Sequence, residues 1–499
     1  MLQQLRDHAR ETALLASIEG LLGWDEQVYL PPAGGAWRAE QLAYLAGQIH
    51  RRRTAPQLGE WLAELRESDA AADPQSDVGC CVAQLTRRYE RETKLPAELV
   101  EEVARVASQS HHAWVEARTA NDFAGFRPWL ERTLDLQRRR AEAFGYEHSP
   151  YDALLDEYEP GATADGVGRV LGSLREELAP LVRQIVDSRV VAPSELLARS
   201  FPVDRQEEFG KLAAAAIGFD FASGRLDVTA HPFCGEAGPA DVRLTTRYQE
   251  HDFGDGFYSI LHEAGHGLYE QGLPDEWYGL PPGESISLGI HESQSRMWEN
   301  LVGRSRGFWR RFFAPCQGVF HEALADVELD DWCFAVNASR PSLIRTESDE
   351  ATYNLHIIVR YELERAMIEG DLAVADLPGA WNEAYAATVG VTPPNDSDGC
   401  LQDVHWPSGA FGYFPTYSLG NLYAAQFFDQ AEADLGDLEA MFAAGEFSPL
   451  LGWLREHIHS VGQRVTASEL VQRVTGQPLS HEPLMRRLRA KFGELYGFA

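Results

Sequence analysis

Cysteine is scarce in this 499-residue chain, and its six cysteines form no CxxC pair and no regular spacing. A disulfide framework is therefore excluded, and we expect reduced, mostly buried thiols. No run of eighteen apolar residues occurs, so no segment is expected to span a membrane. The first twenty residues form a charged helical pattern without the apolar core of a signal peptide. Together these absences predict a cytoplasmic protein.

Lysine is nearly absent, with only three among the 44 basic residues, and positive charge is outnumbered by 76 acidic residues. The formal net charge of −32 argues against nucleic acid or an anionic membrane as a partner, because both repel such a surface. A solvated acidic surface that keeps the protein in solution is the simplest interpretation.

The remaining composition is that of a globular protein, with 44% hydrophobic and 24% charged residues. Residues 1–218 carry mostly helical periodicity, whereas Asp241–Tyr248 alternates like a strand, and helical patterns return after residue 257. We find no repeats and no low-complexity linker. The sequence predicts one mainly α unit over residues 1–499, with a helical portion 1–218, a site-bearing portion 219–499 and a small antiparallel sheet.

The most informative stretch is FYSILHEAGHGLYEQG, residues 257–272. His262 and His266 are four residues apart, so on a helix both imidazoles face one side and can bind a single ion. Glu263 can take a proton from a water activated by that ion. Gly265 and Gly267 inside the helix each cost roughly 1 kcal/mol relative to alanine, which predicts close approach of another backbone or a substrate.

A metal centre of this type needs a third protein ligand. Glu292, on the next predicted helix, is the best candidate. It would complete a site of two histidines and one glutamate that leaves one coordination position open, and zinc is the usual metal in such a site. Glu270 and Glu276 are nearer in sequence to the histidines. Glu270 lies one turn beyond His266, however, too far along the helix to close a tetrahedron.

Several further motifs occur in the order found in the carboxypeptidase Taq family of metallocarboxypeptidases, which this chain resembles from about Trp24 to its C-terminal helices. The motifs are Trp24-Asp25 with Arg38 and Gln41, His231-Pro232-Phe233, Asp241–Thr245, the metal motif, His291–Gln294, Ile344-Arg345 with Ser348-Asp349, and Gly399–Trp406.

The resemblance implies a helical, two-lobed fold with a deep central groove, related to neurolysin and angiotensin-converting enzyme. It also implies a zinc- or cobalt-dependent carboxypeptidase of broad specificity, commonly a homodimer. In that family pattern His262, His266 and Glu292 bind the metal, and Glu263 is the general base and acid.

A carboxypeptidase must also recognise a free α-carboxylate, which the planar fork of arginine binds through two hydrogen bonds. Arg345 and Arg243 are the candidates. We favour Arg345, because it follows the metal helices in the chain. A structural ion pair is the alternative for either arginine.

Negative charge that develops on the scissile carbonyl oxygen needs a hydrogen-bond donor besides the metal. We favour Tyr417 for this part, with Tyr413, His231 and His405 as further candidates, and core packing of either tyrosine as the alternative. Asp349 or Asp403 is expected to orient a ligand histidine from behind.

The sequence therefore predicts a metallocarboxypeptidase that removes residues from peptides with a free C-terminus, by a metal-activated water with Glu263 as general base. One alternative is a metallo-oligopeptidase that cuts internally, since the same metal site serves both reactions. The other is a catalytically silent peptide-binding protein, which would have no need of Glu263.

Overall fold

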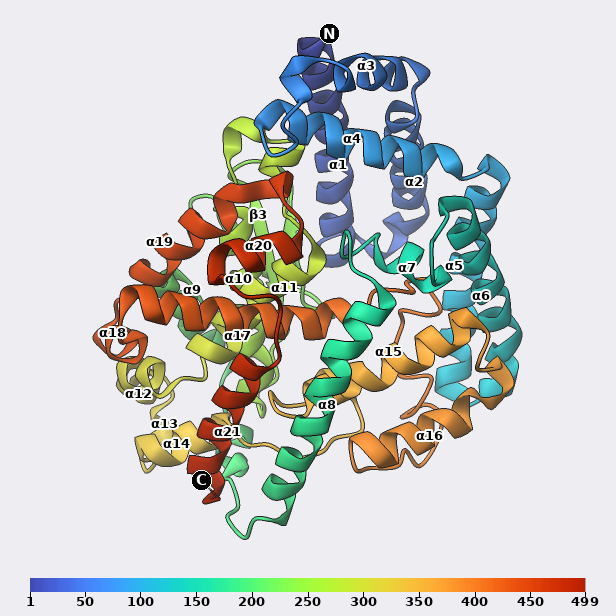
Figure 1. Ribbon diagram of the computed structural model, residues 1–499. Helices are drawn as coiled ribbons and strands as arrows, with labels where there is room; N and C mark the ends of the chain where they lie inside the picture. The colour runs from blue at the N-terminus through green and yellow to red at the C-terminus, as the bar shows by residue number, and fades with distance from the viewer. Residues whose placement is uncertain (499) are drawn as a thin grey trace. The chain divides into compact units, whose positions relative to one another are not determined.

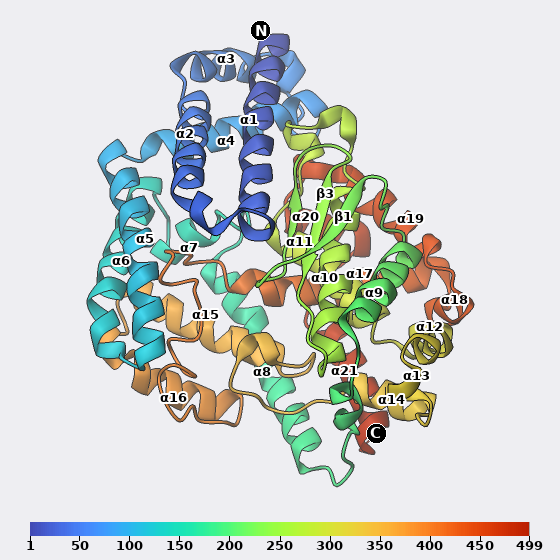
Figure 2. The ribbon, with the colours of Figure 1, turned by 180° about the vertical axis from the view of Figure 1, so that it is seen from behind.

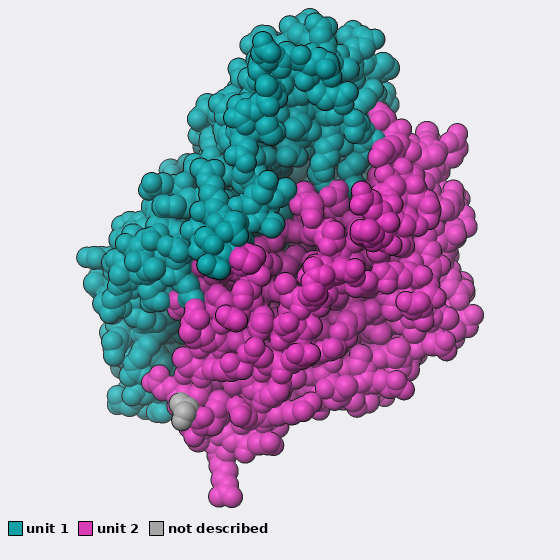
Figure 3. Space-filling model, viewed as in Figure 1, with its two compact units in different colours: residues 1–92, 193–336, 427–477 teal, residues 93–192, 337–426, 478–499 magenta. Residues whose placement is uncertain are grey.

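The computed structural model describes residues 1–498 and is mainly α-helical, with one small sheet (Figures 1 and 2). The chain forms two compact units, each made of three separate stretches and coloured separately in Figure 3. Unit 1 comprises residues 1–92, 193–336 and 427–477, and unit 2 comprises residues 93–192, 337–426 and 478–499. The predicted fold class is confirmed, whereas the groove between two lobes stays a prediction.

Each helix lies wholly within one of the two units, except α4 (Asp77–Lys94) and α17 (Pro415–Leu435), which contribute to both. The helices of unit 1 are α1 (Leu2–Val28), α2 (Gly35–Arg53), α3 (Pro56–Arg66), α9 (Val203–Ile217), α10 (Phe253–Glu270), α11 (Leu288–Arg296), α12 (Arg306–Val319), α13 (His321–Leu324), α14 (Leu329–Val336), α18 (Leu438–Ala444), α19 (Ser448–His457) and α20 (Ala467–Thr475). Those of unit 2 are α5 (Ala97–Ala120), α6 (Phe123–Phe144), α7 (Pro150–Leu155), α8 (Ala164–Asp187), α15 (Tyr353–Glu369), α16 (Leu377–Thr388) and α21 (Glu482–Tyr496).

The sheet lies in unit 1 and has the strand order β1 (Gly224–Val228), β3 (Val242–Thr246), β2 (Cys234–Glu236). Strand β3 confirms the strand predicted over 241–248. The sheet is mixed, however, not wholly antiparallel as predicted: β1 and β3 run parallel (Figure 2), and only β2 is antiparallel to β3. An alternating sequence pattern specifies which face of a strand is buried, and it does not specify the direction of its neighbours.

Helix α10 is the buried centre of unit 1. Its apolar residues recur at helical spacing and are all buried; they are Phe253, Phe257, Ile260, Leu261, Ala264 and Leu268. The Asp252 side chain caps its first turn by accepting the N–H of Asp255 at 3.1 Å. The apolar face of α10 is thereby fixed in the core, and His262 and His266 lie on the other face of the helix.

Gly265 and Gly267 of α10 mark close approaches, as predicted. A β-carbon at Gly265 would lie 2.6 Å from Cα of Ser295 and 2.7 Å from the carbonyl oxygen of Gln294, both in α11. A β-carbon at Gly267 would lie 2.7 Å from the Phe219 ring and 2.9 Å from Leu244 on β3. Gly265 therefore lets the backbone of α11 lie directly against α10.

We predict that Gly265→Ala destabilises the protein and displaces α11, because the added carbon meets backbone atoms that cannot rotate away. Overpacking of this kind costs about 1–3 kcal/mol, measurable in urea titration as a lower free energy of unfolding. Gly254→Ala in the same helix is the control, since its β-carbon would meet only Asp252 Oδ1, at 3.4 Å. Equal stability of the two variants would contradict the packing account.

Candidate active site

His262 and His266 lie one turn apart on the same side of α10, with ring centroids 4.9 Å apart. Glu292 of α11 points its carboxylate between them: its Oε2 lies 3.6 Å from Nε2 of His262 and 3.4 Å from Nε2 of His266. One ligand atom from each of the three residues lies within 4.8 Å of the others. Among the residues that the structure describes, no other such group of His, Cys, Asp or Glu occurs.

These separations fit a divalent ion. The two N···O distances exceed the usual hydrogen-bond length of about 2.7–3.2 Å. Two ligands that each lie about 2.1 Å from a tetrahedral ion are separated by about 3.4 Å. Since two imidazoles and one carboxylate also leave a tetrahedral position open, the donor set is that of a catalytic zinc-type site.

Glu292 is only 6% exposed, yet it stays ionised. Burial alone would raise the pKa of its carboxyl, but Arg296 and His262 outweigh burial and hold that pKa well below its usual range. The Arg296 Nε donates to Oε1 at 2.6 Å, and the Ser295 hydroxyl donates to Oε2 at 3.0 Å. The negative charge needed to bind a cation is therefore present before the ion arrives.

The Nδ1 atom of each histidine, which faces away from the ligand group, contacts a second side chain. Neither of these side chains is one of those predicted. His262 Nδ1 lies 2.8 Å from Glu299 Oε2, and His266 Nδ1 lies 2.5 Å from His291 Nδ1. The expectation that Asp349 or Asp403 orients a ligand histidine is wrong, because both carboxylates are engaged within unit 2.

Glu299 was not predicted, although the sequence carries a signal for it. Together with Arg296 it follows Glu292 at helical spacings of four and seven residues, so all three point the same way. Glu299 lies in the π-helical segment η6 (Met297–Val302), a distortion often found at functional sites. Arg296 bridges the two carboxylates, donating also to Glu299 at 3.2 Å.

Glu263 is 6% exposed, and burial raises the pKa of its carboxyl to about 7, with His262 opposing that rise. A carboxylate with a pKa near neutrality is suited to take up a proton and release it again. The side chain of Glu270, by contrast, contacts His291 at 2.6 Å and stands outside the ligand group, as predicted.

The two remaining candidates of unit 1 lie around the sheet. Arg243 on β3 donates to both carboxylate oxygens of Asp241, at 2.8 and 2.9 Å, and its guanidinium lies 4.2 Å from the Trp24 ring centroid. Arg243 therefore forms a structural ion pair, which was the alternative to binding the terminal carboxylate of a substrate. His231 is exposed in the loop before β2.

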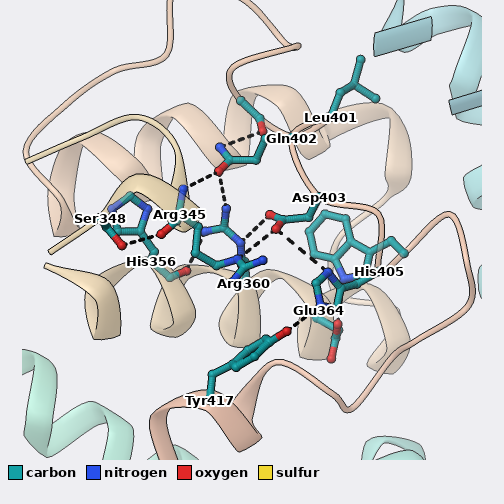
Figure 4. Close-up of polar contacts among 12 residues, drawn as sticks. Arg345, Ser348, His356, Arg360, Glu364, Leu401, Gln402, Asp403, His405 and Tyr417 are labelled. Carbon is teal, nitrogen blue, oxygen red and sulfur yellow. Dashed lines mark hydrogen bonds and ion pairs between the residues drawn. The ribbon is translucent and has the colours of Figure 1, made fainter. Parts of the chain in front are cut away.

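Unit 2 holds a second polar cluster, shown in Figure 4, around the carboxylate of Asp403. The Arg345 Nε donates to it at 2.9 Å and the Arg360 Nε at 2.6 Å, and both arginines are nearly inaccessible. The Gln402 side-chain oxygen accepts from the Arg345 backbone N–H and from the Arg360 guanidinium. The Tyr353 hydroxyl accepts from Arg345 at 3.1 Å.

The charges of this cluster do not cancel. Two guanidinium groups share one carboxylate, and the described residues supply no second carboxylate paired with either. Arg360 is completely buried, so bulk water does not solvate its charge. An excess of one positive charge in a desolvated cluster favours an anionic ligand.

Three other candidates gather beside this cluster. His405 Nε2 lies 3.2 Å from the Tyr417 hydroxyl, while its buried Nδ1 has no hydrogen-bond partner in the described part of the chain. The Tyr417 ring lies 5.1 Å from the Arg345 guanidinium. Tyr413 packs its ring against His405 and against Tyr158, at 5.3 and 5.1 Å. The sequence thus selected residues that do lie together, but it assigned no role to Gln402 and did not select Arg360.

Three comparisons relate this chain to known proteins. The family model of the carboxypeptidase Taq (M32) metallopeptidases matches residues 4–492. The thermostable carboxypeptidase 1 of Thermus thermophilus is 49% identical over 504 aligned residues, which cover 99% of each chain. Carboxypeptidase 1 of Bacillus subtilis is 38% identical over 95% of each chain. The crystal structure of the M32 carboxypeptidase from Deinococcus radiodurans superposes with a TM-score of 0.96, at 45% identity over 99% of each chain.

We predict that Glu292→Ala loses the metal on dialysis, because two imidazoles remain and the negative charge between them is gone. Glu276→Ala is the matched control, since Glu276 is exposed and outside the ligand group. Elemental analysis of both dialysed variants gives the metal content per chain. Full occupancy in Glu292→Ala would mean that the third ligand lies elsewhere.

Proposed function

This chain belongs to the carboxypeptidase Taq (M32) family of metallocarboxypeptidases, and we propose that it removes C-terminal residues one at a time, holding a divalent metal with His262, His266 and Glu292. The observation that carries the metal assignment is the convergence of two imidazoles and one ionised, buried carboxylate at separations of 3.4 and 3.6 Å. Zinc suits this donor set best, with cobalt as the alternative.

The bound metal would polarise the scissile carbonyl and a water molecule. Glu263 takes the proton of that water and then passes it to the leaving amine. Its position next to His262 in α10 and its burial support this part, because a buried carboxylate with a raised pKa can both accept and release a proton.

We propose Arg345 as the group that binds the terminal carboxylate of the substrate, supported by the excess positive charge of the cluster it shares with Arg360 and Asp403. Arg243 is the second choice, since its Nε and Nη2 groups already donate to the carboxylate of Asp241. For the donor to the developing carbonyl oxyanion we propose Tyr417, with Tyr413, His405 and His231 as further candidates.

A peptidase that cuts internally is the second candidate function, since its chemistry at the metal would be identical. The C-terminus of the substrate separates the two, because only the exopeptidase depends on a free α-carboxylate. A silent peptide-binding protein is disfavoured by the intact, buried Glu263.

We further propose that the protein acts in the cytoplasm as a homodimer. All six cysteines are free thiols, which suits a reducing compartment. No helix among the described residues is long and apolar enough to cross a membrane. Light scattering coupled to size exclusion tests the dimer directly: a mass near twice the chain mass of 55.6 kDa is expected, and a mass near that of one chain would contradict it.

We predict that Glu263→Gln retains the metal and loses turnover, because an amide has the same shape but accepts no proton. The loss should reach roughly 10²–10⁴-fold in kcat. The assay compares turnover of an N-blocked peptide at equal metal content, confirmed by elemental analysis. A near-normal rate in the metal-loaded variant would refute the assignment of Glu263.

We predict that amidation of the substrate and the change Arg345→Ala are strongly non-additive, since both remove the same ion pair. In wild type, amidation should lower kcat/KM by an amount equivalent to about 2–5 kcal/mol. In Arg345→Ala the amide and the acid should be cleaved at similar rates. Additive losses would transfer the role to Arg243, and equal cleavage of both substrates by wild type would favour the internal peptidase.

A further inference from the structure

The two metal-binding histidines differ in what holds them from behind. His262 Nδ1 contacts a carboxylate, that of Glu299, which Arg296 also contacts. His266 Nδ1 instead contacts another imidazole, that of His291, with ring centroids 4.6 Å apart. His291 in turn places its Nε2 2.6 Å from Oε1 of Glu270. His266 therefore begins a series of two polar contacts, first to the imidazole of His291 and then to the carboxylate of Glu270.

Hydrogen-bond chemistry assigns a direction to this series. If Nε2 of His266 offers its lone pair to the metal, the proton of the neutral ring must sit on Nδ1. That N–H donates to Nδ1 of His291, which must then be an acceptor. The proton of His291 accordingly sits on Nε2 and donates to Glu270. Each nitrogen has one role, and no alternative tautomer satisfies all the contacts.

The far end of the series supports the same direction. Burial and the neighbouring Glu270 raise the pKa of Glu236 on β2 to about 9, so Glu236 is protonated at neutral pH and has a proton to donate. Burial alone would raise the pKa of Glu270, but the hydrogen bond from His291, the electrostatic effect of that imidazole and the hydrogen bond from Glu236 together lower it. Glu270 thus remains a carboxylate that accepts from both sides. Both glutamates line a cavity of about 140 Å³ in unit 1.

We propose that His291 and Glu270 are positioning residues for the metal: they lock His266 in the Nδ1–H tautomer, fix the plane of its ring and increase its strength as a ligand. The inference rests on the proposed metal assignment. Buried hydrogen-bonded partners behind a ligand histidine commonly contribute 10–100-fold to metal affinity. Because the partner here is a second histidine, the effect depends on two side chains and is lost when either is changed.

The test uses His291→Phe and His291→Gln in the full-length protein. Phenylalanine keeps a ring between His266 and Tyr269 but can accept no hydrogen bond. Glutamine can accept from His266 with its carbonyl and donate to Glu270 with its amide. We expect the dissociation constant for zinc, measured by chelator competition, to rise about 10–100-fold in His291→Phe and to be largely restored in His291→Gln.

Two further variants separate this role from a merely structural one. Glu270→Gln keeps the side-chain shape but removes the charge, so zinc should bind less tightly, whereas Glu276→Gln at an exposed position should bind as wild type does. Without metal, all four variants should unfold at similar temperatures, whereas their affinities for zinc should differ.

Wild-type affinity in His291→Phe, or in Glu270→Gln should His291→Phe fail to fold, would overturn the inference. Equal weakening in His291→Phe and His291→Gln would do the same, because ring packing would then suffice as the explanation. The metal assignment fails separately, through metal retention in Glu292→Ala.

Discussion

The close contact between α10 and α11 is the constraint on which the rest of the metal centre depends. Glu292 can reach His262 and His266 because the backbone of α11 comes within 2.6 Å of the position that a β-carbon of residue 265 would take. The cost of glycine inside a helix, roughly 1 kcal/mol, is offset by that contact. The buried apolar face of α10 then fixes the side on which the histidines point.

Charge balance is the second constraint on the residues of the site. In unit 1 the carboxylates of Glu292 and Glu299 share Arg296, Arg304 also lies 3.9 Å from Glu299, and Glu292 keeps its Oε2 turned toward the two histidines. Burial alone would raise the pKa of Glu299, but Arg296 and His262 lower it to about 2. In unit 2 two arginines share Asp403, and the excess is positive, which suits an anion. A metal ion and a terminal carboxylate are the two charges that a metallocarboxypeptidase has to bind.

The sequence predicted the parts of the site that follow from short-range geometry. The spacing of His262 and His266 follows from helical periodicity, Glu292 was chosen from its place on the next helix, and the close approach at Gly265 from the cost of glycine in a helix. The structure brings the three side chains together and places α11 against Gly265, whereas the metal itself stays a prediction. The partners behind the histidines were missed or assigned wrongly, because they depend on how α10, α11 and η6 pack together. The role of Arg345 in binding the terminal carboxylate stays a prediction. Its sharing of Asp403 with Arg360 joins residues that no local pattern connects.

The central claim is that two imidazoles and one carboxylate hold the metal. X-ray absorption at the zinc edge of the loaded wild-type protein tests this most directly, since it counts and identifies the ligand atoms. We expect two imidazole nitrogens at about 2.0–2.1 Å, carboxylate oxygen at about 2.0–2.2 Å and no sulfur. A single imidazole, three imidazoles, or a sulfur at about 2.3 Å, for which Cys234 near Glu263 would be the source, would contradict the account.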